Sequence, residues 1–314
     1  MARTLALLLD TLGRHATWAL FGGVLIGLAL PGLAALARPL LAPCVVLLLT
    51  AALLRVDWTV MLGYARRPAL LLGLAAWCML VCPVVTWLLI GLVPLPASLS
   101  TAIVLMAAAP PILAATGIAV VLGLDGALTT VAVLLSTVLT PLSVPLLALA
   151  LLDLELDIGL VEFMLRLGLV IGAALALALV AKRFYSPEAL RARARQIDGI
   201  FVILMLVFAV AIMDGVSEVI LSRPAHAALW LGAAFVANPI LQILGALAFA
   251  GLGRRRALTA GLLSGNCNMG VMLATLPPEG NFDIVLYFAL AQLPMYMLPA
   301  LLAPAYRRIL ARTP

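Results

Sequence analysis

Long apolar runs separated by short polar connections fill almost the whole chain. Because a helix needs about 20 mostly apolar residues to cross a bilayer, these runs predict ten membrane-spanning helices. They cover about residues 16–36, 39–54, 68–91, 99–123, 126–151, 158–181, 197–215, 226–250, 256–277 and 282–306. Hydrophobic residues make up 66% of the chain and charged residues 10%, so polar groups cannot cover its surface in water. We expect an all-α polytopic membrane protein with one membrane domain, residues 1–314.

The basic residues are sorted by side of the membrane. With a cytoplasmic N-terminus and ten spans, three of the 19 fall on the outer side, Arg38, Arg166 and Arg223. The other sixteen share the inner side: Arg3, Arg14, Arg55, Arg66, Arg67, Lys182, Arg183, Arg191, Arg193, Arg195, Arg254, Arg255, Arg256, Arg307, Arg308 and Arg312. This positive-inside pattern predicts that both termini are cytoplasmic. It also accounts for the net charge of +6 without a basic patch for nucleic acid.

Composition also predicts a location. Lys182 is the only lysine among 19 basic residues, and alanine and leucine dominate the apolar runs. This usage is typical of a GC-rich bacterial genome, so we expect an integral protein of a bacterial inner membrane.

Prolines of the first half of the chain recur in the second half at nearly constant offsets. Pro83 and Pro239 are 156 residues apart, and the pairs Pro141–Pro294 and Pro145–Pro299 are 153 and 154 apart. We therefore predict two repeats, about 15–152 and 158–308. Since each repeat has five spans, an odd number, the second must enter the membrane from the opposite face. Inverted repeats of this kind are typical of secondary transporters.

The fourth span is interrupted by residues that break helices. Its segment APPILAATG, residues 109–117, contains Pro110 and Pro111, which lack backbone N–H donors, and Gly117, which permits non-helical angles. Backbone groups around Ala115 and Thr116 should therefore be freed at membrane depth.

The ninth span carries a matching interruption, at an offset of 152–153 residues. In SGNCNMG, residues 264–270, Gly265 and Gly270 bracket Asn266, Cys267 and Asn268. Asparagine amides are costly in lipid unless they bond to protein, water or a substrate. Both breaks could instead serve helix packing, but their matching positions in two repeats favour a shared binding site. Half-helices that start after the breaks would present positive dipole ends to an anion, and the preceding halves would present carbonyls to a cation.

The candidate substrate-binding or ion-binding residues are those of the two breaks and the adjoining fifth span. They are Ala115, Thr116, Thr129, Ser264, Asn266, Cys267 and Asn268. The candidate break or hinge residues are Pro110, Pro111, Gly117, Gly265 and Gly270. Asn238 and Gln242 lie one turn apart beside Pro239, and Gln292 precedes Pro294; these amides could satisfy carbonyls at helix kinks rather than touch a substrate.

Three stretches resemble the bile acid:sodium symporter superfamily. They are MAAAPPILAATGIAVVLGLDGALTTVAVLLSTVLTPLSVPLL at 106–147, TAGLLSGNCNMGVMLATLP at 259–277 and YARRPALLLGLAAWCMLVCPVVTW at 64–87. The resemblance implies ten helices in two inverted five-helix repeats. It places spans 1, 2, 6 and 7 in a panel domain and spans 3–5 and 8–10 in a core domain, whose fourth and ninth spans unwind and cross. It also implies an organic-anion cargo, often carried with sodium.

The sodium-binding residues that the resemblance implies are poorly kept. An acidic residue is implied where the chain has Leu263, a Gln-Asn pair where it has Cys267 and Asn268, and a third-span glutamine where it has Cys78. A hydroxyl–amide pair is implied at Ala115 and Thr116. Thr116, Thr129 and Asn268 are the plausible carry-overs. Because hard cations need oxygen ligands and compensating charge, sodium coupling is open but not favoured.

We therefore expect a secondary transporter for a small organic anion that works by alternating access. We expect no resident cofactor, and the oligomeric state is open. One alternative is a metalloid or thiophilic-ion exporter of the same fold, in which Cys267 supplies a soft ligand. Another is a non-transporting membrane sensor. An enzyme is not expected, because the spans contain no HExxH, GxSxG or clustered carboxylates.

Overall fold

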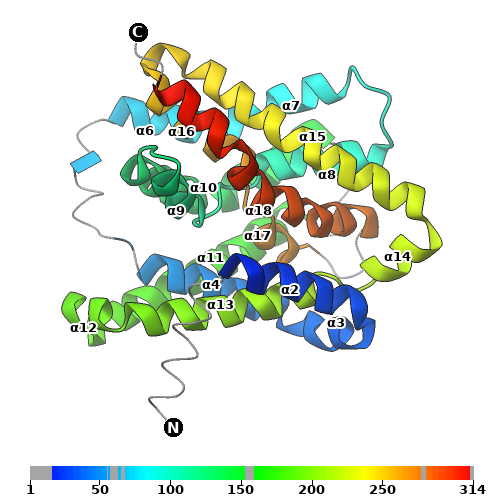
Figure 1. Ribbon diagram of the computed structural model, residues 1–314, viewed down its shortest axis with the longest axis horizontal. Coiled ribbons are helices and arrows are strands. Elements are labelled where there is room, and N and C mark those ends of the chain that lie inside the picture. Colours follow the sequence, from blue (N-terminus) through cyan, green and yellow to red (C-terminus); the bar gives the residue numbers. More distant parts are fainter. Residues whose placement is uncertain are drawn as a thin grey trace. The chain divides into compact units, whose positions relative to one another are not determined.

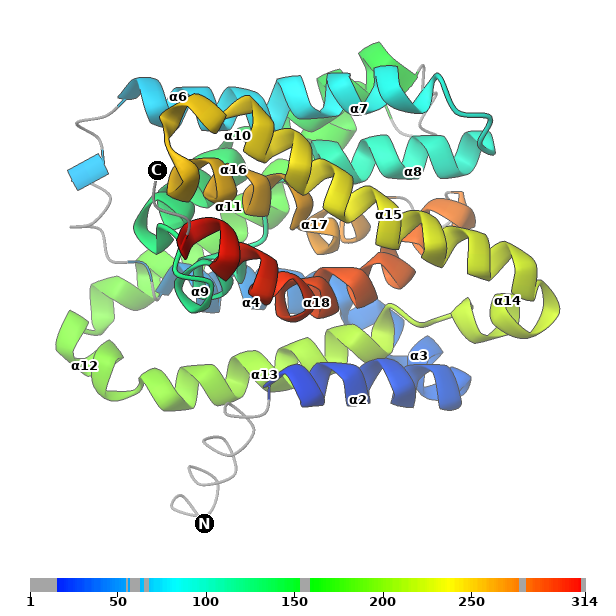
Figure 2. The same ribbon diagram turned by 45° about the horizontal axis from the view of Figure 1, so that its top comes forward.

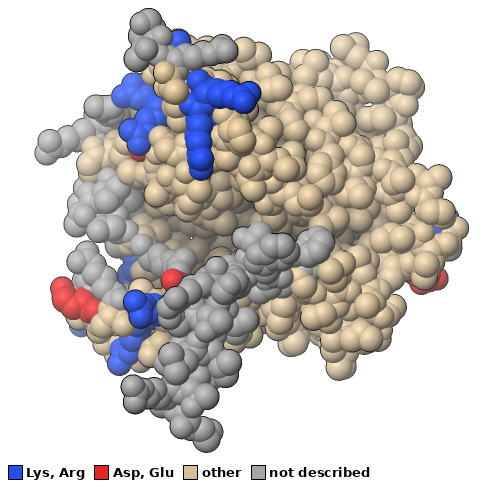
Figure 3. All heavy atoms as spheres, in the orientation of Figure 1, with Lys and Arg blue, Asp and Glu red and all other residues tan. Residues whose placement is uncertain are grey.

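The computed structural model describes residues 16–54, 56, 63–64, 68–152, 159–276 and 281–311. Every regular element among them is helical (Figure 1), so the all-α prediction is confirmed. Several residues behind the topology prediction, Arg3, Arg14, Arg55, Arg66, Arg67 and Arg312, lie outside the described residues. Among the residues not drawn in grey, most of the face in Figure 3 is uncharged, and Lys and Arg gather at its upper left, near the C-terminus, and at its lower left.

Seven of the described helices are long and apolar enough to cross a membrane. They are Pro31–Leu54, Pro68–Ile90, Gly126–Leu152, Leu160–Phe184, Ala194–Ala211, Pro224–Ala248 and Phe282–Ala311. The other three expected spans do not form single long helices. The first contains the 14-residue α2 (Ala16–Ala29), and the fourth and ninth are each divided into two short helices. Interruption accounts for the fourth and ninth spans, and α2 begins at the first residue that the structure describes, so the count of ten spans stays a prediction.

The chain separates into two compact units. Unit 1 comprises residues 1–56 and 169–227, and unit 2 comprises residues 57–168 and 228–314. Unit 1 contains the segments that the resemblance assigns to the panel domain, and unit 2 those assigned to the core domain. The division falls inside the sixth expected span, within α11 (Leu160–Phe184).

Unit 1 is built around α13 (Ala194–Ala211), which runs beside α2 (Figures 1 and 2). Its other elements are α3 (Pro31–Ala37), η1 (Arg38–Leu40), α4 (Leu41–Leu54), most of α11, α12 (Pro187–Ala192) and α14 (Val216–Ser222). Small residues such as Ala34, Ala37 and Ala211 form a buried cluster between α3 and α13. Close helix approach through small residues is the usual means of packing in membranes.

Unit 2 contains the interrupted helices. In chain order it has α6 (Pro68–Ala76), η2 (Trp77–Val81), α7 (Cys82–Ile90), α8 (Ala97–Ala108), α9 (Ala115–Val121), α10 (Gly126–Leu152), α15 (Pro224–Ala248), η3 (Ala250–Leu252), α16 (Arg254–Gly265), α17 (Met269–Leu273) and α18 (Phe282–Ala311). The start of α11 also belongs to this unit. The long helices α10 and α18 each follow an interrupted span. They supply much of the buried apolar surface of unit 2.

A π-helical turn joins α6 to α7. Pro83 has no N–H to donate to the carbonyl of Met79, and its ring crowds that turn of helix. The backbone widens over Trp77–Val81, so that the N–H of Cys82 donates to the Trp77 carbonyl five residues earlier. Such π-bulges are frequent at functional sites, and this one directs Trp77 and Cys78 toward α16.

Packing in unit 1 provides a matched test at two glycines of α2. A Cβ on Gly27 would lie 2.8 Å from Met213 Cβ and 2.9 Å from the Val210 oxygen, whereas a Cβ on Gly22 would meet nothing within 4 Å. We expect Gly27→Ala to cost roughly 1–3 kcal/mol through overpacking. Gly22→Ala should be neutral or stabilising by up to about 1 kcal/mol. Thermal unfolding in detergent measures both, and equal effects would contradict this packing.

Candidate functional site

The first interruption lies between α8 and α9. Helix α8 ends at Ala108, and Ala109 is extended, with φ −65° and ψ 145°. A residue that precedes proline is driven from the helical region by the proline ring. Pro110 and Pro111 then provide no backbone donors, and regular helix resumes at Ala115. Gly117 lies in the first turn of α9, is exposed and has a φ outside the left-handed region, so the interruption comes from the prolines.

The second interruption lies between α16 and α17. Asn266 has φ −105° and ψ 75°, and Asn268 has φ −85° and ψ 74°, so both leave the helical region. The Asn268 side chain accepts from Val271 N at 3.4 Å and thereby caps α17. Asparagine favours this position because its oxygen satisfies a donor that has no partner inside the helix.

The two interruptions pair with each other through their backbones. Pro111 and Cys267 form an antiparallel bridge. The Ile112 N–H donates to the Asn266 carbonyl at 2.8 Å, and the Asn268 N–H donates to the Pro110 carbonyl at 2.6 Å. Each segment therefore satisfies groups that the loss of helix freed in the other, as buried backbone requires. We call residues 109–114 and 266–268 together the crossing.

Side chains of α16 and the crossing donate to backbone carbonyls of α16. Ser264 Oγ donates to the Ala260 carbonyl at 2.8 Å and accepts from Trp77 Nε1 at 2.8 Å. Cys267 Sγ donates to the Ser264 carbonyl at 3.3 Å. Asn266 Nδ2 donates to the Leu262 carbonyl at 2.9 Å, while its Oδ1 has no partner among the residues that the structure describes.

The candidate residues of the first repeat differ in how they relate to the crossing. Ala115 is fully buried and Thr116 half-buried at the start of α9. The hydroxyls of Thr130 and Thr116 are hydrogen-bonded at 3.2 Å, which joins α10 to α9. Thr129 Oγ1 instead donates to the Asp125 carbonyl of its own helix at 2.8 Å, as buried threonines commonly do. No described contact brings Thr129 to the crossing.

A buried hydrogen-bond chain holds the end of α16 in place. Tyr306 OH donates to Gln242 Oε1, Gln242 Nε2 donates to Asn238 Oδ1, and Asn238 Nδ2 donates to the Gly265 carbonyl, each at 2.6 Å. From their spacing beside Pro239, the sequence predicts that the amides of Asn238 and Gln242 satisfy carbonyls at a helix kink. The carbonyl that Asn238 bonds to is that of Gly265, in the facing helix α16. No sequence signal identified Tyr306, because it lies 64 residues from its partner.

Glycines allow α15 and α16 to approach backbone to backbone. A Cβ on Gly265 would lie 2.8 Å from the Asn238 carbonyl oxygen, and one on Gly261 would collide with the Gln242 carbonyl oxygen. Gly245 faces Ala260 and Ser264 in the same way. The close contact with Asn238 is the reason that position 265 needs glycine. The backbone conformation is not the reason, because it is not left-handed. Gly270 lies within α17 and is buried.

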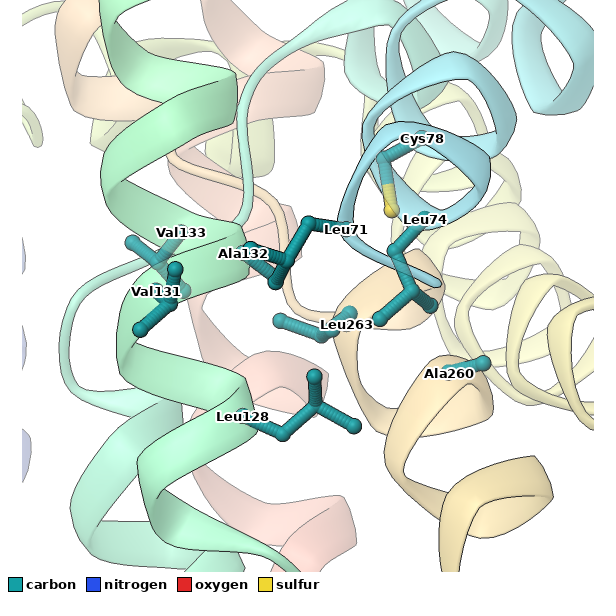
Figure 4. Close-up of a cluster of buried hydrophobic side chains, with 9 residues drawn as sticks. All are labelled: Leu71, Leu74, Cys78, Leu128, Val131, Ala132, Val133, Ala260 and Leu263. Carbon is teal, nitrogen blue, oxygen red and sulfur yellow. The ribbon is translucent and has the colours of Figure 1, made fainter. Parts of the chain in front are cut away.

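Apolar side chains surround the position that the resemblance assigns to an acidic cation ligand. Leu263 is fully buried and points between α6 and α10, among Leu74, Leu128 and Ala132 (Figure 4). Cys78, at the implied glutamine position, belongs to the same cluster. Across the described ranges there is no group of three His, Cys, Asp or Glu side chains placed to hold a metal ion. None of the nine side chains of this cluster carries an oxygen that could bind a hard cation.

A comparison of the whole sequence with known families gives one match. The Sodium Bile acid symporter family matches residues 42–223, which is more than half of the 314 residues. The matched region includes the first interruption and ends before the second. No curated protein matches the chain.

The hydrogen-bond chain can be tested with two buried tyrosines of α18. Tyr306→Phe leaves Gln242 Oε1 without its donor, which we expect to cost about 1–3 kcal/mol. Tyr287→Phe is the control, because its hydroxyl has only a weak 3.5 Å contact with Met106 Sδ, and it should cost less. Thermal unfolding of both purified variants measures the difference. A Tyr287→Phe loss equal to or larger than the Tyr306→Phe loss would contradict the role of the chain.

Proposed function

The chain belongs to the sodium bile acid symporter family, and from that premise we propose that it is a secondary transporter that moves a small organic anion by alternating access. Membership makes it an integral membrane transporter, a class whose members are not enzymes. The family's name refers to bile acid and sodium, and bile acids are organic anions. We place the protein in a bacterial inner membrane, with both termini in the cytoplasm.

The pairing of Pro111 with Cys267 is the observation that carries this proposal. Unwound backbone is tolerated inside a bilayer only where protein or a polar cavity surrounds it. In secondary transporters, paired discontinuous helices of this kind form the substrate site near the bilayer midplane. We therefore assign the cargo site to the crossing, with Asn266, Cys267 and Asn268 of the crossing and the adjacent Thr116 and Ser264 as its polar groups.

We further propose ten spans in two inverted repeats, about 15–152 and 158–308. Seven long helices are supplemented by α2 and by the interrupted pairs α8–α9 and α16–α17. Reciprocal contacts support the inversion. Asp125, just before α10, accepts from Leu128 N, and its own N–H donates to Thr259 Oγ1 in the middle of α16. Asp283, at the start of α18, accepts from Ser98 Oγ near the start of α8. Each repeat's last span thus contacts the other repeat's interrupted helix.

The same site argues that transport does not use the family's sodium chemistry. The apolar cluster around Leu263 and Cys78 stands where oxygen ligands are implied, and a buried cation without compensating charge is strongly disfavoured. We propose facilitated exchange or uniport. For the alternative cargo, a thiophilic ion, Cys267 would have to release its bond to the Ser264 carbonyl, so the organic anion is favoured.

Asn268 provides the direct test of the site. Asn268→Leu removes the cap of α17 and an amide of the crossing, so we expect uptake of radiolabelled anions by proteoliposomes to be abolished. The cap itself is worth only about 1 kcal/mol, so the variant should fold, which size-exclusion chromatography in detergent checks. Thr86→Val is the matched control, because Thr86 only donates to the Cys82 carbonyl of its own helix. Undiminished uptake by folded Asn268→Leu would refute the site assignment.

Sodium dependence is tested separately in the same vesicles. Replacing sodium with N-methyl-D-glucamine on both sides should leave the transport rate within about twofold, because no oxygen-ligand site compensates a buried cation. The membrane potential is held constant with potassium and valinomycin. A tenfold or larger fall in uptake that sodium restores would show that ligands other than those described bind the ion.

A further inference from the structure

Five arginines gather where α16 begins and α18 ends. Three are consecutive in the first turn of α16 and two lie near the end of α18; they are Arg254, Arg255, Arg256, Arg307 and Arg308. The two helix ends are packed together, because Tyr306 and Leu310 of α18 share an apolar cluster with Leu258 and Leu262 of α16. Lys and Arg gather at the upper left of Figure 3, where these helix ends lie in Figure 1. We call these five residues the arginine cluster.

Four of the five guanidinium groups are not neutralised within the described chain. Arg254, Arg307 and Arg308 are exposed, and Arg256 is partly exposed. No ion pair or hydrogen bond joins the side chains of these four to another residue that the structure describes. Positive charges held close together repel one another, and a bound anion relieves that repulsion.

The fifth arginine and the neighbouring carboxylate are engaged in contacts inside unit 2. Arg255 Nη2 donates to the Leu124 carbonyl at 3.1 Å, which fixes the start of α16 against the turn before α10. The oxygens of Asp125, the next residue, accept from Tyr64 OH at 2.7 Å and from Leu128 N at 3.0 Å. One carboxylate that is already bonded cannot balance five guanidinium groups. The described part of this region therefore keeps an excess of positive charge.

An exposed apolar stripe on α15 leads to the arginine cluster. Its residues recur every three or four positions and therefore share one helix face; they are Val236, Ile240, Ile243 and Leu247. Beyond the helix, Leu252 is 45% exposed, two residues before Arg254. Because this helix is part of a membrane protein, such a face is suited to contact with acyl chains.

Helix α18 carries a second stripe that ends in the cluster itself. Met297 and Leu301 are exposed, and Arg308 follows Leu301 at two helical turns, on the same face. The two helices are neighbours at this end, because Tyr306 OH of α18 bonds to Gln242 Oε1 of α15. Apolar surface and unneutralised positive charge are therefore continuous along both helices.

From this continuity we propose that the arginine cluster binds the phosphate of an anionic phospholipid whose acyl chains lie along α15 and α18. Guanidinium groups suit phosphate, because their planar donors can bond two of its oxygens at once. Clusters of basic residues at the end of membrane helices attract anionic headgroups. A free phosphate would use the charge and leave the apolar stripes unused, so the lipid is the better match.

A lipid at this place would brace the helices that hold the crossing. Helix α16 runs from the arginine cluster directly to the crossing, and Tyr306 of α18 begins the chain of hydrogen bonds that ends at the Gly265 carbonyl. The site lies at the other end of α16 from the crossing, and lipid binding there does not depend on which cargo is carried.

Lipid titration of the purified protein in detergent tests the site. Dioleoylphosphatidylglycerol is compared with dioleoylphosphatidylcholine, which has the same chains and no net charge, and binding is followed by thermal unfolding. We expect the anionic lipid to bind at least about tenfold more tightly, and this advantage to shrink at high salt. Inorganic phosphate at the same concentration is the third arm. It should give no comparable stabilisation, because it lacks the chains.

Two pairs of substitutions with the same change of charge locate the site. Arg254→Gln combined with Arg308→Gln removes one guanidinium from each helix, and we expect the affinity for the anionic lipid to fall about fivefold for each arginine. Arg183→Gln combined with Arg223→Gln is the control, since both side chains are exposed and belong to unit 1. The control should leave the affinity within about twofold.

Three results would overturn the proposal. They are equal affinity for the two lipids, an equal loss in both pairs of variants, and stabilisation by inorganic phosphate that matches stabilisation by the anionic lipid. The last would show a site for free phosphate. If the first pair does not fold, Arg256→Gln combined with Arg307→Gln replaces it and must show the same loss.

Discussion

Two backbone hydrogen bonds between unwound segments organise unit 2. The proline pair in one segment and the asparagines in the other each remove helix from an apolar span, which would leave polar backbone unsatisfied in lipid. Bonds from Ile112 to Asn266 and from Asn268 to Pro110 satisfy that backbone. Neither interruption is stable alone, so the two spans must be present together. This mutual dependence places side chains from both halves of the chain at one point.

Close helix packing and a chain of hydrogen bonds hold the crossing in place. Gly261 and Gly265 let α16 contact the backbone of α15, and this proximity allows Asn238 to reach the Gly265 carbonyl. Gln242 and Tyr306 extend the chain of bonds to α18. Buried polar chains of this kind are rigid when every member is satisfied. These contacts hold the backbone at Asn266 in place. Its Oδ1 has no hydrogen-bond partner among the described residues.

The charged and apolar side chains of unit 2 occupy different places. Leu263 and Cys78 lie in a closed apolar cluster, so that part of unit 2 contributes packing energy rather than ion ligands. The carboxylates that structure the unit, Asp125 and Asp283, lie at helix starts and bond to hydroxyl or backbone groups. The polar side chains at and beside the crossing are amides, hydroxyls and a thiol, which form hydrogen bonds without carrying a charge.

The sequence by itself determined that the protein is helical and lies in a membrane, because apolar runs of this length have no other solvent. It also determined where two helices must break, since Pro110, Pro111 and the Asn266–Asn268 segment act locally. Only the tertiary structure decided which groups remain available. Thr129 is bonded within its own helix, Tyr306 joins the site across 64 residues, and Asn266 alone keeps a free buried acceptor in the described crossing. The partner of Tyr306 is distant in sequence, and no local pattern tells whether a side chain such as that of Thr129 bonds within its own helix or stays available.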